Sequence, residues 1–176
     1  LQTAATFDYN VQNSYSIRLR SWDQGGLFVE KAFTVLVTRL NLSPNTPVNL
    51  SPSDGAASQL LTPSLQASAF SDPDSGDSQT ASQWLIYRTA DNALVFDSGT
   101  NTTDTSSFTV PTEVLNYATA YAWQVRYQDN HDAWSGYSTA TTFSTIAPSL
   151  SVARQSGSVL LLWPTNATDF SLEFST

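Results

Sequence analysis

The sequence predicts an all-β fold, with β-sandwich modules in tandem and incomplete modules at both ends. Short segments rich in Val, Ile, Thr, Tyr and Phe alternate apolar and polar residues with period two along the whole chain. Loops carrying Pro, Gly, Asp and Asn separate these segments at the spacing expected of a sandwich. Nowhere do apolar residues keep the spacing of an amphipathic helix over three turns.

The first forty residues predict a β-hairpin. Residues 15–20, Y-S-I-R-L-R, place their apolar side chains on one face of a strand, and residues 31–40 alternate in the same way. Between them, residues 23–26, D-Q-G-G, supply turn residues that tolerate positive φ. Residues 41–52 are rich in Asn, Pro and Ser and therefore predict a linker.

The next hundred residues predict one complete sandwich. Its expected strands are 64–70, 83–89, 94–97, 106–110, 120–128 and 139–144. Residues 113–117 predict at most a short helical turn. A last block contributes expected strands at 150–153, 159–163 and 170–174, which are too few to close a second sandwich.

Three segments near the start carry a family resemblance. Residues 7–10 (F-D-Y-N), 15–27 (Y-S-I-R-L-R-S-W-D-Q-G-G-L) and 33–38 (F-T-V-L-V-T) resemble the C-terminal half of a cadherin-like repeat of bacterial surface proteins. The resemblance implies a partial cadherin-like module over residues 1–42. It also implies that acidic residues in three motifs bind calcium between successive repeats.

The residues at these motif positions differ from the cadherin-like pattern. Asp23 matches one expected aspartate, but Ser21 replaces the alanine of that motif. Asn10 replaces an acidic residue, and Arg39 stands where the linker of the family has an aspartate. Because Ca²⁺ requires six to eight oxygen ligands, mostly anionic, these changes argue against calcium binding there.

The middle and last blocks carry resemblances of their own. Residues 115–129 (L-N-Y-A-T-A-Y-A-W-Q-V-R-Y-Q-D) and 134–145 (W-S-G-Y-S-T-A-T-T-F-S-T) resemble a fibronectin type III-like domain of secreted bacterial proteins, assigned to residues 43–145. The resemblance implies that the Tyr121 hydroxyl fixes a corner by bonding to backbone. Residues 148–165 resemble the opening strands of another immunoglobulin-like module, which makes residues 146–176 a partial module.

Charge and composition exclude several classes of function. Seven Lys and Arg against fifteen Asp and Glu give a net charge of −8, which argues against nucleic acid or an anionic membrane as partner. Cysteine is absent, so neither disulfides nor thiolate chemistry are available. No apolar run approaches the ~20 residues that span a bilayer. The acidic, Ser- and Thr-rich composition favours an extracellular or cell-surface location.

An acidic loop at residues 71–77, S-D-P-D-S-G-D, is the candidate metal site. Asp72, Asp74 and Asp77 supply three carboxylates, which are ligands that Ca²⁺ accepts. The loop does not fit an EF-hand, because the twelfth position is Gln83 instead of glutamate. A solvated turn, for which Asp and Pro are typical residues, is the favoured alternative. No cofactor is required by this interpretation.

No catalytic residue is predicted. His131 is the single histidine and lies in a segment, D-N-H-D, expected to form a hairpin turn. A His–Asp pair can act as a general base, but the chain contains neither a G-x-S-x-G motif nor another nucleophile signature. The sequence therefore predicts a protein that is not an enzyme.

The five tryptophans divide into core and surface candidates. Trp84, Trp123 and Trp163 lie in apolar or alternating segments and are expected in the core. Trp22 and Trp134 lie beside turns and are the candidate contacts for a glycan, although aromatic residues at strand ends more often cover the edge of a sandwich.

The favoured function is a non-catalytic structural or adhesive spacer in a large bacterial surface or secreted protein. Its partners are then neighbouring modules and other surface proteins. One alternative is a carbohydrate-binding accessory region of a secreted polysaccharide-degrading enzyme. The other is a filament subunit in which the incomplete ends of neighbouring copies associate head to tail by strand complementation.

Overall fold

A computed structural model describes residues 6–9 and 11–164 of the chain. It divides into two compact units, Leu1–Asn41 and Leu42–Thr176. Every helix or strand element in the described residues is a β-strand, which confirms the predicted all-β class. Within that part of the chain, no helix has the length and apolar content needed to cross a bilayer.

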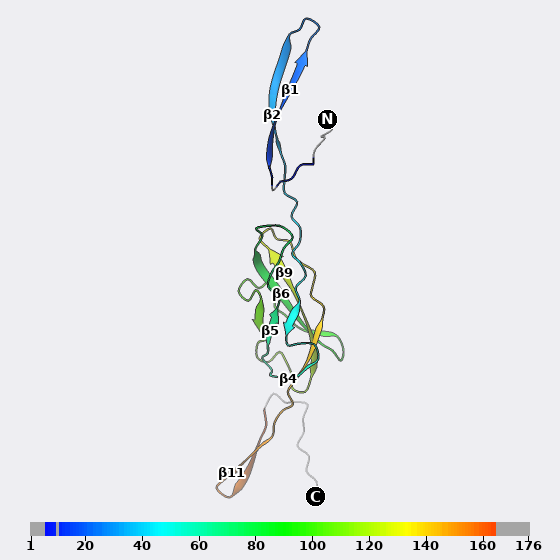
Figure 1. The fold of residues 1–176 in the computed structure, drawn as a ribbon. Helices are drawn as coiled ribbons and strands as arrows, with labels where there is room; N and C mark the ends of the chain where they lie inside the picture. The colour runs from blue at the N-terminus through cyan, green and yellow to red at the C-terminus, as the bar shows by residue number, and fades with distance from the viewer. Residues whose placement is uncertain (1–5, 10, 165–176) are drawn as a thin grey trace. The chain divides into compact units, whose positions relative to one another are not determined.

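Two sheets form a β-sandwich between residues 49 and 145 (Figure 1). One sheet has the order β3-β5-β8, with β3 at Asn49–Ser51, β5 at Ser64–Ala67 and β8 at Ser107–Thr109. The other has the order β4-β10-β9-β6-β7, with β4 at Ala56–Gln59, β10 at Thr141–Thr145, β9 at Ala120–Asp129, β6 at Gln79–Arg88 and β7 at Ala93–Asp97. The predicted sandwich is therefore present.

The core of the sandwich is built around two stacked tryptophans. Trp84 on β6 and Trp123 on β9 are both fully buried, and their ring centroids lie 5.8 Å apart. Phe108 of the opposite sheet stacks on Trp84 at 6.0 Å, which joins the two layers. Every second residue of β9, including Trp123, points into this core, and Trp84 is buried on β6, so both tryptophans lie in the core as predicted.

The corner before β9 has the predicted tyrosine bond. Tyr121 is buried, and its hydroxyl accepts a hydrogen bond from the Asn116 amide at 2.8 Å. Leu115 packs into the core beside it, while the rest of residues 113–117 forms turns and bends with no helix. The predicted bond of the Tyr121 hydroxyl to backbone is confirmed, whereas the short helical turn that the sequence allowed at residues 113–117 is not formed.

Two strands of the sandwich differ from the sequence predictions. β3 lies inside residues 41–52, where a linker was predicted, and β4 was not predicted at all. Both are short, and β4 pairs in parallel with β10, more than eighty residues further along the chain. Local alternation cannot predict such strands, because their stability comes from backbone pairing with distant partners.

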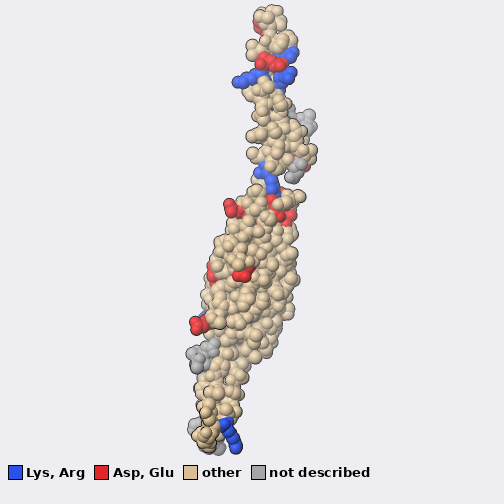
Figure 2. Space-filling view, turned by 90° about the vertical axis from the view of Figure 1, so that its left-hand side faces the viewer, with Lys and Arg blue, Asp and Glu red and all other residues tan. Residues whose placement is uncertain are grey.

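The described part of the first unit is one antiparallel hairpin of β1 (Ser14–Trp22) and β2 (Phe28–Leu36). The predicted turn is confirmed, since the Asp23 carboxylate accepts hydrogen bonds from the Gly25 and Leu27 amides. The second strand begins earlier than predicted and ends at Leu36, because it follows the register of β1. Figure 2 shows charged side chains of both signs gathered on this hairpin, where Arg20 pairs with Glu30 at 2.6 Å.

A second isolated hairpin follows the sandwich, formed by β11 (Ser151–Gln155) and β12 (Ser158–Leu162). All its residues are exposed, and Trp163 just beyond it is 43% exposed. The expectation that Trp163 is a core residue is therefore wrong in this structure, because no second layer covers the two-stranded hairpin within the described residues. The expected strand at 170–174 lies outside the described residues.

Candidate functional site

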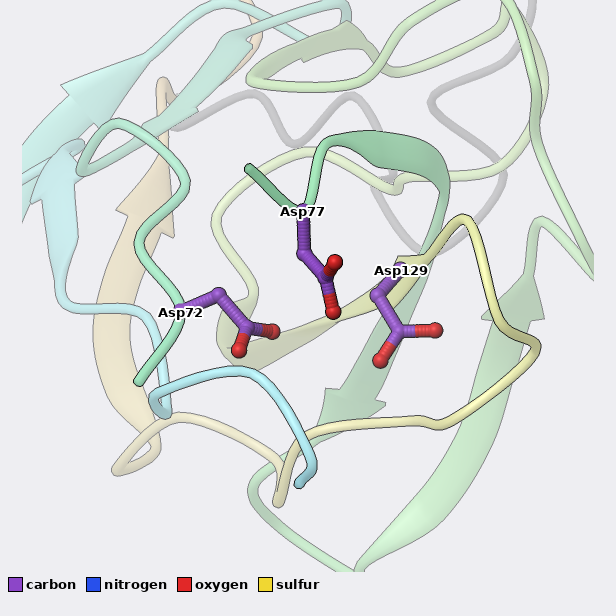
Figure 3. Close-up of side chains that lie close together, drawn as sticks. All are labelled: Asp72, Asp77 and Asp129. Carbon is purple, nitrogen blue, oxygen red and sulfur yellow. The ribbon is translucent and has the colours of Figure 1, made fainter. Parts of the chain in front are cut away.

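Three carboxylates converge at one end of the sandwich (Figure 3). Asp72 and Asp77 belong to the loop between β5 and β6, and Asp129 ends β9. The antiparallel register pairs Gln79 with Asp129, which brings the acidic loop against the end of β9. One carboxylate oxygen from each aspartate lies within 4.8 Å of the others. We call Asp72, Asp77 and Asp129 the acidic cluster.

The acidic cluster is largely removed from solvent. Asp129 is fully buried, and its Oδ1 accepts hydrogen bonds from the His131 and Ala133 amides at 2.8 and 2.9 Å. The Asp77 side chain is 1% exposed, and its Oδ1 lies 3.5 Å from His131 Nε2. Asp72 Oδ1 accepts from the Asp74 amide at 2.8 Å, whereas Asp72 Oδ2 is buried without a hydrogen-bond partner among the described residues.

Asp74, the third predicted ligand, has a different contact. Its Oδ2 accepts a hydrogen bond from the Leu42 amide at 2.7 Å, and it is not one of the three carboxylates that converge. The structure therefore brings together two of the three predicted residues and adds Asp129. Sequence analysis assigned Asp129 only to a turn, since nothing in local spacing indicates that it faces the acidic loop.

The donor chemistry of the acidic cluster suits a hard cation, because carboxylate oxygens are what Ca²⁺ selects. The number of carboxylate oxygens that are available to coordinate a cation is less favourable. Oδ1 of Asp129 and Oδ1 of Asp72 already accept backbone hydrogen bonds, while Ca²⁺ takes six to eight oxygens. Calcium binding by this loop stays a prediction, with Asp129 as an additional candidate ligand.

His131 lies at the edge of the acidic cluster in the predicted turn. The Asp129 amide bonds to the Ala133 carbonyl at 3.0 Å, which closes that turn. The His131 side chain is 46% exposed and forms an ion pair with Asp77 when it is protonated.

The second candidate residue, Trp134, takes part in a stacked arrangement on the outer face of the large sheet. The Arg126 guanidinium lies over the Trp134 ring at 4.5 Å and over the Tyr137 ring at 4.7 Å. Gln83 Oε1 accepts hydrogen bonds from Arg126 Nε and Nη2 at 3.0 and 2.6 Å. The Tyr137 hydroxyl donates to the same oxygen at 2.9 Å.

The backbone beside this stack is held by two buried serines. Ser135 Oγ accepts from the Tyr127 amide at 3.0 Å, and Ser138 Oγ accepts from the Val125 amide at 2.9 Å. Hydroxyl groups thus take the place of carbonyl acceptors along β9. Because Arg126 occupies one face of Trp134, that face is not available for stacking on a sugar.

Trp22, the other candidate, is more accessible. It is 60% exposed on the first hairpin, and its ring centroid lies 5.0 Å from that of Phe28. Both residues line one shallow hollow at the end of the hairpin. An arginine guanidinium lies over each ring, Arg20 at 5.4 Å from Trp22 and Arg126 at 4.5 Å from Trp134, but Trp22 is exposed whereas Trp134 is half-buried.

The described sandwich belongs to the class of immunoglobulin- and fibronectin III-like β-sandwich modules, with a three-stranded and a five-stranded sheet around an aromatic core. Residues 67–147 match the family described as Rha78A-like, N-terminal immunoglobulin domain. No curated protein matches the chain.

Several solved structures have a similar fold. The α-L-rhamnosidase of Dictyoglumus thermophilum is 18% identical with a TM-score of 0.50, over 70% of this chain and 16% of that chain. The Streptomyces avermitilis α-L-rhamnosidase complexed with L-rhamnose is 20% identical with a TM-score of 0.48, over 59% of this chain and 10% of that chain. Fibronectin(III)-like modules of Clostridium thermocellum CbhA are 16% identical with a TM-score of 0.42, over 76% of this chain and 63% of that chain.

Proposed function

We propose that the sandwich is a non-catalytic structural module that joins other modules in series within a secreted protein acting on carbohydrate. The observation that carries this proposal is that the chain enters and leaves the sandwich at opposite ends. The incoming residues Leu42 and Asn45 bond to Asp74 and Ser71, beside the Asp129 end of β9.

The outgoing chain lies at the other end of the same strand. Ile146 donates to the Gln59 carbonyl at 2.8 Å and accepts from the Ala118 amide at 3.0 Å, next to the start of β9 at Ala120. β9 has ten residues, and a strand rises ~3.3 Å per residue, so the two attachment points are separated by about 30 Å. A module with this geometry separates its neighbours, as a spacer does.

The match of residues 67–147 to the Rha78A-like N-terminal immunoglobulin domain supports the carbohydrate context. The net charge of −8 and the absence of cysteine agree with a surface-exposed module whose fold needs no disulfide. In this proposal the partners are neighbouring modules of the same protein, and its location is extracellular.

The absence of cysteine makes the spacing directly measurable. Nitroxide labels on a Ser43→Cys, Ala147→Cys double variant should give a narrow distance distribution centred at about 30 Å in pulsed electron resonance. A broad distribution, or one centred well below this value, would refute the spacer geometry. Hydrolysis of aryl α-L-rhamnosides by the chain itself would refute the non-catalytic role.

Glycan binding is a second candidate function, favoured by the exposed Trp22 beside Phe28. A glycan array should then show binding that Trp22→Ala removes, because sugars stack on aromatic faces. Trp134→Ala is the comparison, since that ring is half-buried and has the Arg126 guanidinium 4.5 Å over one face. Equal loss in both variants would point away from a site at Trp22.

Self-assembly is the third candidate, favoured by the exposed apolar residues of the two isolated hairpins, among them Phe28 and Leu160. Exposed strand edges pair readily with other strands. Sedimentation velocity over a range of concentrations tests it. Oligomers that grow with concentration support strand exchange, and a single monomeric species at the highest concentration eliminates it.

A further inference from the structure

The segment that leads into the sandwich, residues 42–48, is bound along its length. Three of its backbone amides donate hydrogen bonds: Leu42 to Asp74 Oδ2 at 2.7 Å, Asn45 to the Ser71 carbonyl at 3.0 Å and Val48 to Ser68 Oγ at 3.0 Å. These donors are every third residue, and their acceptors run in the opposite direction along residues 68–74. The segment therefore lies antiparallel to that part of the chain.

The buried residues of the segment follow the same period. Pro44 and Pro47 are both buried, while their neighbours Ser43, Asn45 and Thr46 are exposed. A period of three is that of the polyproline II helix, which makes no hydrogen bonds within itself. Proline fixes its own φ near −65° and restricts the preceding residue to extended conformations. The sequence L-S-P-N-T-P-V thus favours this conformation before any contact is made.

Two further contacts hold the segment against the sandwich. Asn45 Nδ2 donates to Ser71 Oγ at 3.0 Å, in addition to the backbone bond between the same residues. A side chain added at Gly136 would place its Cβ 3.1 Å from Thr46 Oγ1, which shows how closely Thr46 approaches the backbone at Gly136. The end of the acidic loop is in turn bonded to the turn that follows β9, because the amide of Ser78, the next residue after the loop, donates to Asn130 Oδ1 at 2.9 Å.

We propose that residues 42–48 form a polyproline II strap clamped by residues 68–74, so that the sandwich is stiff from Leu42 onward and the Asp74 carboxylate holds the first residue of the strap. Because the strap is extended before it binds, little conformational entropy is lost when it docks. Leu42–Asp74 is the outermost of the three backbone contacts of the strap. The strap itself does not depend on the proposed function. Only the inference that a stiff strap keeps neighbouring modules apart rests on it.

Amide hydrogen exchange of the full chain, followed residue by residue by NMR, tests the strap. The amides of Leu42, Asn45 and Val48 should exchange at least about tenfold more slowly than those of Ser43 and Thr46, after correction for intrinsic rates. Among the described residues, the Ser43 and Thr46 amides have no protein acceptor. Uniformly fast exchange over residues 42–48, or protection with period two, would overturn the proposal.

Two variants test the role of Asp74. Asp74→Ala should speed exchange at Leu42 about tenfold and leave Val48 unchanged, because the inner contacts remain. Asn45→Ala removes only the side-chain bond to Ser71 Oγ, so it should speed exchange of the amide at position 45 by less than about tenfold, because the backbone bond to the Ser71 carbonyl remains. Ser75→Ala, in the same exposed loop, is the control and should change neither. If Asp74→Ala leaves Leu42 protected, Asp74 does not hold the strap. The nitroxide distance, measured separately, reports on the spacer geometry.

Discussion

The Asn116 amide donates a hydrogen bond to the Tyr121 hydroxyl at 2.8 Å, which fastens the corner before β9 to the core strand that follows it. Tyr121 also packs against Phe143 of β10, with ring centroids 5.7 Å apart. One side chain therefore joins the core and the corner. The path of residues 113–119 depends on this bond together with bonds to the end of β10, since Thr145 Oγ1 donates to the Asn116 carbonyl at 2.6 Å and the Ala118 amide donates to the Ile146 carbonyl at 3.0 Å.

Tyr121→Phe should lower the free energy of unfolding by about 1–2 kcal/mol, because it leaves the Asn116 amide without its acceptor. Tyr117→Phe is the matched control, since Tyr117 is only half-buried and its hydroxyl has no hydrogen bond in the described residues. Denaturant unfolding measures both. Equal effects of the two substitutions would contradict a special role for Tyr121.

Arg126→Lys should cost about 1 kcal/mol of stability. A lysine ammonium cannot lie flat between the Trp134 and Tyr137 rings and bond twice to one acceptor, as the guanidinium does. Arg88→Lys is the comparison, because its pair with Asp91 is exposed and such pairs contribute little. Tryptophan fluorescence should change only in the Arg126 variant. An unchanged unfolding midpoint would show that the stack is not stabilising.

Burial raises the pKa of Tyr127 to about 12, above its ordinary value of 10.0. The unfolded chain therefore releases this proton at lower pH than the folded chain, and stability is complete below pH 10 and falls between about pH 10 and 12. The loss is at most about 2.7 kcal/mol, because one pKa unit corresponds to ~1.36 kcal/mol. Tyr127→Phe should remove this part of the alkaline loss, although it also gives up the bond to the Ser68 carbonyl. An identical pH dependence in both proteins would refute the assignment.

The calcium prediction is tested by melting temperature. Millimolar Ca²⁺ should raise it relative to EDTA, since a ligand that binds only the folded state stabilises that state. Asp129→Asn should abolish the rise, while its amide oxygen can still accept the His131 and Ala133 amides. Mg²⁺, which demands octahedral geometry at shorter distances, is the control ion. No shift with Ca²⁺ would remove the metal site.

The sequence by itself determined the all-β class, the main strands of the sandwich, the core positions of Trp84 and Trp123 and the role of Tyr121. These follow from local alternation and from motifs contained in one segment, so no distant contact was needed to predict them. Tertiary structure alone decided the rest. β4 forms through parallel pairing with β10, Asp129 meets the acidic loop through the β6–β9 register, and the predicted linker at residues 41–52 is held by Ser68, Ser71 and Asp74. Each depends on residues far apart in sequence, which meet only through pairing and contacts formed when the sandwich is assembled.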